Sequence, residues 1–342
     1  MANITVADLA RELGLSKSSV SCALNGKPGV SEQTRERVLA YAESLGWFPS
    51  WSARSLSRAK ADAVGVVLRR EPGLIGTEPY YMRVIAGIES VLEEAEVSLV
   101  LRLIGAGPSG DLELYRRWAG ERRVDGVILF DQLGDDPRFE LLNELSLPAI
   151  VHGVPPGEGA KCLRMDYVQE AASIADHLAE NGLRTVVHLT GPCNLLHEQI
   201  RRASLARLCA ERGIEVTSVE SDYTIGGGDE FLRSTPLLPD AVVCANDLLA
   251  LGVQRSAEAQ GVTVPGRLAI VSWDDSILCQ LSRPALTALE RFPEDSGAAS
   301  ARMLLRLING EPVEEEHAPT PILRPRTSSV RVDGLGRAEP PG

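Results

Sequence analysis

The chain has 342 residues, 44% of them hydrophobic and 24% charged, a balance that is typical of soluble globular proteins with two or three lobes. No run of about 18 apolar residues occurs, and the first residues lack a basic segment followed by an apolar one. We therefore expect no membrane span and no export, so the expected location is the cytoplasm.

The net charge of −12 is distributed unevenly along the chain. Residues 1–60 carry eight basic and five acidic residues, whereas the remainder carries 27 basic and 42 acidic ones. A basic head before an acidic body is expected if only the head contacts phosphate. The six cysteines are scattered without a C-x-x-C pair, so we expect no zinc site, no disulfide framework and no cofactor.

Three short helices are predicted in the head. Thr5-Val6-Ala7-Asp8 fits a capping box, apolar residues then recur at helical spacing as far as Leu13, and Gly14 ends this first helix. Ser16 begins a second helix over 17–24, which ends at Asn25-Gly26. Ser31 begins a third helix that ends at Gly46 and whose apolar face contains Val38, Tyr41, Ala42 and Leu45.

The first two helices, joined by about three residues that include a glycine, indicate a helix-turn-helix. The second helix of such a motif enters the major groove of DNA with its N-terminus first. Its outward side chains are then expected to reach bases or phosphates; they are Lys17, Ser18, Ser21 and Cys22, with Ser16 and Ser19 suited to phosphate oxygens. A small helical bundle with solvated polar faces is the structural alternative.

A longer series of residues narrows this interpretation. It comprises Val6-Ala7-Asp8-Leu9-Ala10, Gly14-Leu15-Ser16-Lys17, Leu24-Asn25-Gly26, the stretch 30–38, Leu45-Gly46-Trp47-Phe48-Pro49 and Ala53-Arg54-Ser55-Leu56. Nearly without gaps, this series resembles the head of the lactose-repressor (LacI/GalR) family. The resemblance implies a sequence-specific transcriptional repressor, associated with the nucleoid, that binds a pseudo-palindromic operator as a homodimer.

The resemblance also implies individual DNA contacts. Leu56 would wedge into the minor groove from a hinge that folds on the operator, with Arg54 on a flanking phosphate. Cys22 stands where the family commonly has arginine, and Ser50 stands where asparagine is usual. Because a cysteine cannot make the bidentate contact with guanine that arginine makes, we expect the operator to differ from the family's commonest half-site at the position of Cys22. The expected contacts are Thr5, Ser16, Lys17, Ser18, Ser19, Ser21, Cys22, Asn25, Ser31, Ala53, Arg54 and Leu56.

Beyond residue 62, apolar runs alternate with amphipathic stretches. Strands are expected at 63–68, 97–103, 126–130, 149–151, 186–189, 241–244 and 268–271. Helices are expected at 80–94, 111–121, 166–181, 199–212, 247–260 and 295–309. This alternation predicts parallel sheets covered on both faces, and ligands of such folds lie beyond the carboxyl ends of the strands.

Four segments of this region, Pro79-Tyr80-Tyr81, Val124-Asp125-Gly126-Val127-Ile128, 239–247 and Val271-Ser272-Trp273-Asp274-Asp275, resemble the effector domain of the same family. The resemblance implies a two-lobed, periplasmic-binding-protein-like fold that holds a sugar or sugar derivative between its lobes. Two residues depart from the family's pattern: Glu78 stands where asparagine is usual, and Trp273 where phenylalanine or tyrosine is usual.

Seven side chains are the expected effector contacts, although a structural role stays open for each. The carboxylate of Asp247 would accept two hydroxyl hydrogen bonds, and Arg201 would hold an oxygen or a carboxylate in its fork. The aromatic rings would cover a sugar ring, whereas Asp274 and Asp275 are expected to organise loops. The seven are Tyr80, Tyr81, Asp131, His152, Arg201, Asp247 and Trp273.

The predicted fold class is thus an all-α helix-turn-helix head followed by an α/β effector domain of two lobes. The head would span residues 1–49 and the hinge residues 50–61. The first lobe would contain 62–160 and 292–322, and the second lobe 161–291 and 323–332. Residues 333–342 would form a disordered tail. Connections between the lobes are expected near 159–163, 290–292 and 322–324. Effector binding would move the lobes and change operator affinity in either direction, with a coupling of about 1–3 kcal/mol.

Two other functions fit parts of the sequence. A G-x-G-x-x-G stretch at 105–110 follows a strand and precedes Asp131, as in dinucleotide-binding enzymes, but Pro108 removes a backbone donor from it, so we expect no enzyme. A sugar-binding transport protein would need an export signal and would have no such head. Gly226-Gly227-Gly228 is expected to form a flexible turn.

Overall fold

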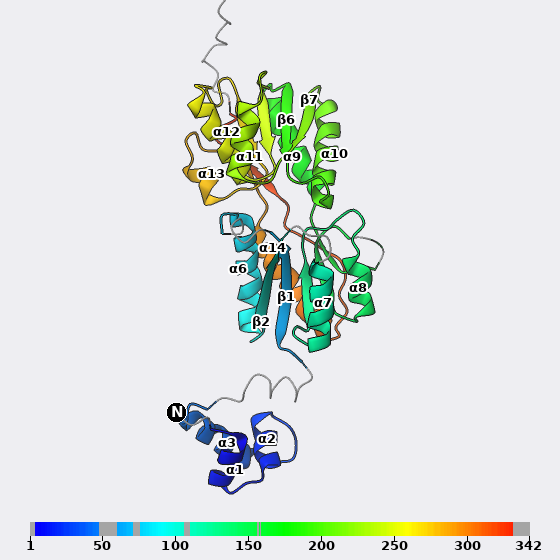
Figure 1. Cartoon of the computed structure of the whole chain (residues 1–342), viewed down its shortest axis with the longest axis vertical. Coiled ribbons are helices and arrows are strands. Elements are labelled where there is room, and N and C mark those ends of the chain that lie inside the picture. The colour runs from blue at the N-terminus through cyan, green and yellow to red at the C-terminus, as the bar shows by residue number, and fades with distance from the viewer. Residues whose placement is uncertain are drawn as a thin grey trace, which may run out of the picture. The chain divides into compact units, whose positions relative to one another are not determined.

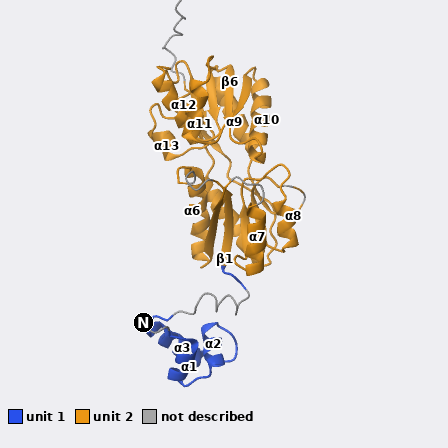
Figure 2. Ribbon diagram, viewed as in Figure 1, with its two compact units in different colours: residues 1–62 blue, residues 63–342 orange. Residues whose placement is uncertain are grey.

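The computed structural model describes residues 4–47, 60–70, 76–105, 110–155, 157 and 159–330. The chain divides into two compact units, residues 1–62 and 63–342 (Figure 2). The first unit is helical, and the second contains two α/β lobes that are each built on one sheet (Figure 1). Among the described residues, no helix is long and apolar enough to cross a membrane.

The three helices of the first unit lie at the predicted positions, as α1 (Val6–Leu13), α2 (Lys17–Leu24) and α3 (Glu32–Ser44) (Figure 1). Local signals set their bounds: the Thr5 hydroxyl accepts from the Asp8 N–H, the Asp8 carboxylate accepts from the Thr5 N–H, and Gly14 ends α1 at φ 64°. Their facing sides form a small core of Leu9, Ala10, Val20, Ala23, Val38 and Ala42.

The apolar face predicted for α3 includes Leu45, but this side chain is 40% exposed. Leu45 is the residue at which α3 ends, so the chain has already begun to turn away from the core there. Trp47 packs against the core instead, and its indole Nε1 donates to the carbonyl oxygen of Ile4 at 2.6 Å. The head therefore closes through a contact between its two ends.

Ser16 fixes the start of α2, because its hydroxyl oxygen accepts a hydrogen bond from the Ser19 N–H at 3.0 Å. Ser16→Ala leaves that N–H without a protein partner, at a cost of about 1 kcal/mol. We expect backbone amides of α2 to exchange with solvent roughly fivefold faster in the free full-length protein, measured by hydrogen–deuterium exchange. Ser44→Ala, in the last turn of α3, is the control; equal exchange in the two variants would show that the cap does not limit the opening of α2.

The first lobe is built on a parallel sheet of order β11-β5-β4-β3-β1-β2. On β1, Val64 and Val66 point into the core shared with α6 and α14, whereas Gly65 between them faces Trp118 of α7, so helices cover both faces. The strands are β1 (Ala63–Arg69), β2 (Ser98–Ile104), β3 (Gly126–Leu129), β4 (Ala149–Gly153), β5 (Cys162–Arg164) and β11 (Glu316–His317). The helices are α6 (Pro79–Glu94), α7 (Gly110–Glu121), α8 (Arg138–Glu144) and α14 (Pro293–Ile308).

The second lobe repeats this plan with a sheet of order β12-β10-β9-β8-β6-β7, in which only β12 among the described strands runs antiparallel to its neighbour. The strands are β6 (Thr185–Thr190), β7 (Glu215–Glu220), β8 (Ala241–Cys244), β9 (Ala269–Ser272), β10 (Thr287–Glu290) and β12 (Ile322–Arg324). The helices are α9 (Tyr167–Glu180), α10 (Leu196–Ala210), α11 (Ile225–Arg233), α12 (Asp247–Ala259) and α13 (Ile277–Leu281).

The central strand β8 shows why the inner strands of the second sheet have continuous apolar sequences. Ala241 and Val243 pack with α9 and α10, while Val242 and Cys244 pack with α11 and α12 on the opposite face. A strand buried on both faces has no polar side to alternate with the apolar one. The predicted fold class, a helical head followed by an α/β region with parallel-dominated sheets, is confirmed.

Three segments connect the lobes, between β5 and α9, between β10 and α14, and between β11 and β12. Two of the expected boundaries need correction. β5 pairs with β4 in the first sheet, so the boundary expected after residue 160 lies too early. Ile322 pairs with Glu290 in the second sheet, so the last connection ends before Ile322 rather than after it.

The predicted elements omit α8, α11, α13 and several short strands, among them β7 at the edge of the second sheet. β7 alternates half-buried and exposed residues, and its sequence Glu215-Val216-Thr217-Ser218-Val219-Glu220 lacks the apolar run that marks a central strand. An edge strand is solvated on one side, so its composition is closer to that of a loop.

The flexible turn expected at Gly226-Gly227-Gly228 is wrong, because these residues form the first turn of α11, which begins at a Thr224 cap. A side chain at Gly228 would bring its Cβ to 2.2 Å from the Leu249 carbonyl oxygen. Reciprocally, a Cβ at Gly252 of α12 would lie 2.1 Å from the Ile225 carbonyl oxygen. These glycines allow the backbones of α11 and α12 to approach closely.

Candidate functional site

A cavity of about 50 Å³ is lined by residues of both lobes. The first lobe contributes Tyr80 and Tyr81 from the first turn of α6, Asp131 after β3 and His152 from β4. The second contributes Arg201 from α10 and Asp247, the first residue of α12 after β8. Six of the seven predicted effector contacts therefore line one cavity, because the carboxyl ends of parallel strands meet at the same edge of each sheet.

One wall of the cavity is organised by Arg70, which directly follows β1. Its guanidinium donates to Glu78 Oε2 at 3.0 Å, to Asp131 Oδ2 at 2.9 Å and to the Tyr81 hydroxyl at 3.0 Å. Tyr81 in turn donates to Asp131 Oδ1 at 2.6 Å. Burial raises the pKa of Asp131, but the charges of Arg70 and other nearby basic groups, together with the Tyr81 hydrogen bond, hold the pKa of this carboxyl below its usual value. Asp131 is therefore an ion-pair partner as well as a wall residue.

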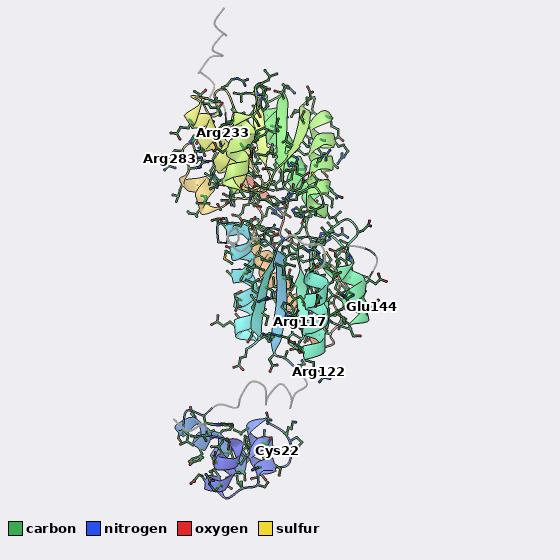
Figure 3. The ribbon with its side chains drawn as sticks, in the orientation of Figure 1. Cys22, Arg117, Arg122, Glu144, Arg233 and Arg283 are labelled. Atoms are coloured by element: carbon green, nitrogen blue, oxygen red, sulfur yellow. The ribbon has the colours of Figure 1, made fainter. Side chains whose placement is uncertain are left out.

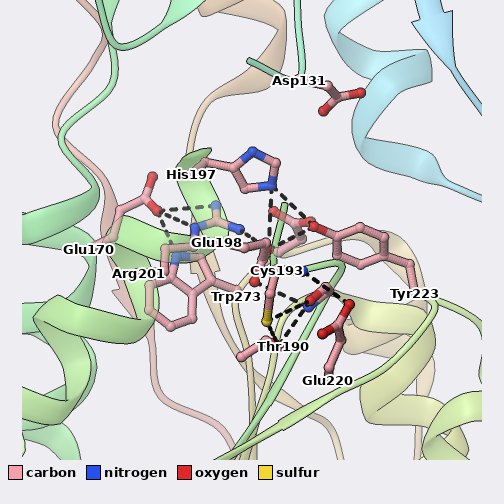
Figure 4. A network of polar contacts seen from close by, with 12 residues as sticks. Asp131, Glu170, Thr190, Cys193, His197, Glu198, Arg201, Glu220, Tyr223 and Trp273 are labelled. Atoms are coloured by element: carbon pink, nitrogen blue, oxygen red, sulfur yellow. Dashed lines mark hydrogen bonds and ion pairs between the residues drawn. The ribbon is translucent and has the colours of Figure 1, made fainter. Parts of the chain in front are cut away.

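The second lobe carries a larger network around Glu170 of α9 (Figure 4). Glu170 Oε2 accepts from Arg201 Nη2 at 3.2 Å, and Glu170 Oε1 accepts from Arg291 Nε at 2.8 Å. Arg201 also reaches Glu198 Oε1 at 3.5 Å, and Arg291 reaches Asp274 Oδ1 at 2.7 Å. Burial raises the pKa of Glu170, but the charges of Arg291 and Arg201, helped by hydrogen bonds from Trp273 and Arg291, bring it below its usual value. This carboxylate is therefore ionised between two buried cations.

Trp273 does not line the cavity as expected. Its side chain is fully buried, its ring stacks on His188 at a centroid distance of 5.2 Å, and its indole N–H donates to Glu170 Oε2 at 2.6 Å. The Arg201 guanidinium lies over the same ring at 4.9 Å, so Trp273 supports Arg201 from behind (Figure 4). Trp273 directly follows β9, and the sequence alone could not show whether a side chain at that position lines the cavity or lies behind it.

Asp247 is the carboxyl group of the cavity with an unused oxygen. The residue is 3% exposed, and within the described part of the chain its Oδ2 has no hydrogen-bond partner. Burial raises the pKa of Asp247 to about 6, with a further increase from the charge of Asp274 and an opposing hydrogen bond from Ser276. A buried acceptor without a partner is costly, so this oxygen is available for a donor that enters the cavity.

His152 faces the cavity from the first lobe and is uncharged at neutral pH. Burial lowers the pKa of this imidazole to about 3, and the nearby Arg291 lowers it as well. Its Nδ1 lies 3.0 Å from Ser300 Oγ, and its Nε2 lies 3.5 Å from the Tyr80 hydroxyl. The ring therefore presents a neutral hydrogen-bonding edge beside Tyr80.

Several cavity residues were not predicted from the sequence, notably Arg70, Tyr167, Tyr223 and Arg291, together with Glu170 and Glu198 behind them. Arg70 and Arg291 each directly follow a strand, which is the signal that also indicates Asp131. Glu170 and Glu198 lie inside helices, where an acidic residue normally indicates solvent exposure. Only the tertiary structure shows that both are 1% exposed.

The predicted DNA contacts of the head lie at its surface. Ser16, Lys17, Ser18 and Ser21 are exposed, and Cys22 is half-buried on α2 (Figure 3). Thr5 and Ser31 are also exposed, whereas Ser19 and Asn25 are half-buried. Ser50, Ala53, Arg54 and Leu56 lie outside the described residues, so the hinge contacts stay predictions.

Comparisons with known proteins agree with both parts of the chain. Residues 5–50 match the model of the bacterial regulatory proteins of the lacI family, and residues 175–329 match that of the periplasmic binding protein-like domain. The HTH-type transcriptional regulator CelR of Thermobifida fusca is 30% identical over 321 residues, which cover 91% of this chain and 93% of CelR. This chain belongs to the lacI family of bacterial regulatory proteins. The catabolite control protein A of Priestia megaterium is 29% identical over 330 residues, 93% of this chain and 97% of that protein.

Solved structures of lacI-family regulators share the fold. A LacI family transcriptional regulator from Bifidobacterium animalis subsp. lactis has a TM-score of 0.72 and 31% identity, covering 79% of this chain and 98% of that one. A CelR–cellobiose complex has a TM-score of 0.71 and 27% identity over 95% of this chain and all of that one. A lac repressor dimer bound to operator and the anti-inducer ONPF has a TM-score of 0.81 at 22% identity, covering 96% and 99% of the two chains, and shows the shared fold. The lacI-family protein described here is a DNA-binding transcription regulator and not an enzyme.

Proposed function

We propose that this regulator represses transcription as a homodimer on a pseudo-palindromic operator, and that a carbohydrate bound in the cavity between its lobes changes its operator affinity. The repressor would act in the cytoplasm, at the nucleoid. The observation that carries the effector proposal is the buried Asp247 oxygen without a partner, which lines a polar cavity together with Tyr80, Tyr81 and Tyr223. Aromatic faces beside hydrogen-bond acceptors suit a ring that carries hydroxyl groups.

The contacts between the two lobes support the allosteric part of the proposal. Arg83 of α6 donates to the Asp275 carbonyl oxygen at 2.9 Å and pairs with Glu290 Oε1 at 3.3 Å, and both partners belong to the second lobe. A movement of one lobe against the other must therefore rearrange these contacts as well as the cavity. The relative crystallised as a CelR–cellobiose complex supports a carbohydrate as the ligand class.

The proposed function is tested with the purified full-length protein. Genomic fragments are selected on it at about physiological salt and sequenced, and the enriched site is titrated with and without carbohydrates. We expect one pseudo-palindrome and a sugar that changes its affinity by about 5–150-fold. Asp247→Asn should weaken the sugar response, whereas Asp176→Asn, in an exposed pair with Arg212, should keep it. Enrichment of no site would reject the regulator mechanism, and a site insensitive to every sugar would reject the carbohydrate effector.

Cys22 gives a second test that concerns the head alone. A thiol cannot donate the two parallel hydrogen bonds by which arginine recognises guanine O6 and N7. We expect Cys22→Arg to shift the selected operator toward guanine at one symmetric position in each half-site, with about 1–3 kcal/mol of discrimination. Selection with both proteins in parallel measures this shift. An unchanged sequence preference would show that position 22 does not contact a base.

A further inference from the structure

The cavity contains more carboxyl groups than guanidinium groups. Three buried arginines, Arg70, Arg201 and Arg291, are each bound by two carboxylates within 3.5 Å. Five carboxylates suffice for these pairs because Glu170 is shared, and Asp247 is a sixth acid that pairs with no arginine of the described residues. His197 also lines the cavity, and its Nε2 already contacts Glu198 Oε1 at 3.4 Å.

Three of the carboxyl residues that line the cavity are Glu78, Asp247 and Asp274; we call this group the acidic corner. Glu78 is paired with Arg70 and Asp274 with Arg291, whereas Asp247 has no such pair among the described residues. Burial raises the pKa of Glu78 to about 7, and the charge of Asp274 raises the pKa of both Glu78 and Asp247. A cation beside these groups would favour their charged forms.

Glu78 adds a carboxyl group to the cavity. Glu78 precedes α6 without capping it through its side chain, and its carboxylate turns to Arg70 instead. Arg70 is thereby bound by both Glu78 and Asp131, so its guanidinium is already neutralised toward an anionic ligand.

We propose that the ligand of this cavity carries a protonated amine, as an amino sugar does, and that the amine binds in the acidic corner against the free Asp247 oxygen. This inference rests on the proposed function and narrows its ligand class. An ammonium group donates up to three hydrogen bonds and supplies the cationic partner that Asp247, unlike Glu78 and Asp274, lacks among the described residues. An acidic sugar would meet arginines that are already neutralised, and a neutral sugar would leave the excess charge unbalanced.

The experiment compares ligands that differ only in the charge of one substituent. Glucose, glucosamine, N-acetylglucosamine and glucuronate, with cellobiose and the chitosan disaccharide as a larger pair, are titrated into the full-length protein at neutral pH by calorimetry. The change in melting temperature of the protein is recorded for each compound. We expect an amine to bind at least about tenfold more tightly than its hydroxyl and N-acetyl counterparts, and the uronate to bind least.

Two variants separate charge from shape. Glu78→Gln keeps the size of the side chain and should reduce the preference for the amine over the hydroxyl to about onefold to threefold. Glu315→Gln is the matched control, because Glu315 pairs with Arg164 at the exposed edge of the same lobe, and it should leave the preference unchanged. If Glu78→Gln fails to fold, the comparison of the charged and neutral ligands on the wild-type protein still tests the proposal.

The outcomes distinguish this proposal from the one on which it rests. Tighter binding of a neutral sugar or of the uronate would overturn the amine proposal and leave the carbohydrate effector in place. Binding of none of these compounds, with operator binding intact, would overturn both the amine proposal and the carbohydrate effector. Absence of operator binding would instead reject the DNA-binding mechanism, while amine selectivity in the same preparation would still support the acidic corner.

Discussion

Replacing Glu170 with glutamine is expected to destabilise the second unit by about 3–5 kcal/mol, because it removes the carboxylate that two buried arginines share. Arg201 and Arg291 would keep their charges, because a guanidinium is not deprotonated in proteins and each retains one carboxylate partner, Glu198 or Asp274. The glutamine amide would also direct an N–H toward one of them. The cost is that of a carboxylate lost to two buried cations and to the Trp273 indole rather than of one lost hydrogen bond.

Urea denaturation of the full-length protein measures this loss, with Glu315→Gln as the control. Glu315 makes an equally direct bidentate pair with Arg164, but both side chains are about one-third exposed, so we expect a change below about 1 kcal/mol. Because the folded-state pKa of Glu170 is lowered, its stabilising contribution is present above the unfolded value of 4.5 and lost as pH falls through the lowered value. A Glu170→Gln protein as stable as wild type at neutral pH would mean that the two arginines are compensated without it.

The second large effect is expected at Gly87, where α6 crosses α14. A Cβ at this position would lie 1.9 Å from the Glu294 carbonyl oxygen, and a Cβ at Gly297 of α14 would lie 2.2 Å from the Val84 carbonyl oxygen. Since both obstacles are backbone atoms inside helices, Gly87→Ala must separate the helices. We expect a loss of roughly 3 kcal/mol and a weaker sugar response, because Tyr80 and Tyr81 lie two turns earlier on α6.

Gly120→Ala is the control for this substitution. Gly120 is also in a helix, α7, but a Cβ there meets nothing within 4 Å, so alanine should be neutral or stabilising by up to about 1 kcal/mol. Thermal unfolding of the two variants beside wild type makes the comparison. Similar melting temperatures for Gly87→Ala and Gly120→Ala would mean that α6 and α14 can move apart without cost.

The three helix starts of the head were predictable to the residue because their signals are local. A capping residue and a glycine at φ > 0 act within four positions of themselves, so Thr5, Ser16 and Ser31 fix the helix starts whatever the rest of the chain does. Central strands were predictable for a related reason, since burial on both faces needs an unbroken apolar run. The edge strand β7 and the helix α11 were not, because the composition of β7 is set by partial exposure and that of α11 by the close approach of α12.

The cavity was predictable only in part. Asp131 and Asp247 follow strands, and their place in a parallel fold follows from topology. Glu170, which binds two of the cavity's arginines, lies in a helix 31 residues from Arg201 and 121 residues from Arg291. No local pattern marks such a pair, and a buried glutamate inside a helix looks like an exposed one until the helix is packed.

The three connections between the lobes also determine the order in which the protein can be completed as it leaves the ribosome. The head is whole once its last helix has emerged, but the first lobe lacks α14 and β11 until the strands β6–β10 have been made. At about 5–20 residues per second, the interval between Arg164 and Pro293 is on the order of ten seconds. Throughout it, the face of the first sheet that Ala301, Met303 and Leu304 later bury stays uncovered. The two lobes therefore finish almost together, and that interval is when the nascent chain most needs a chaperone.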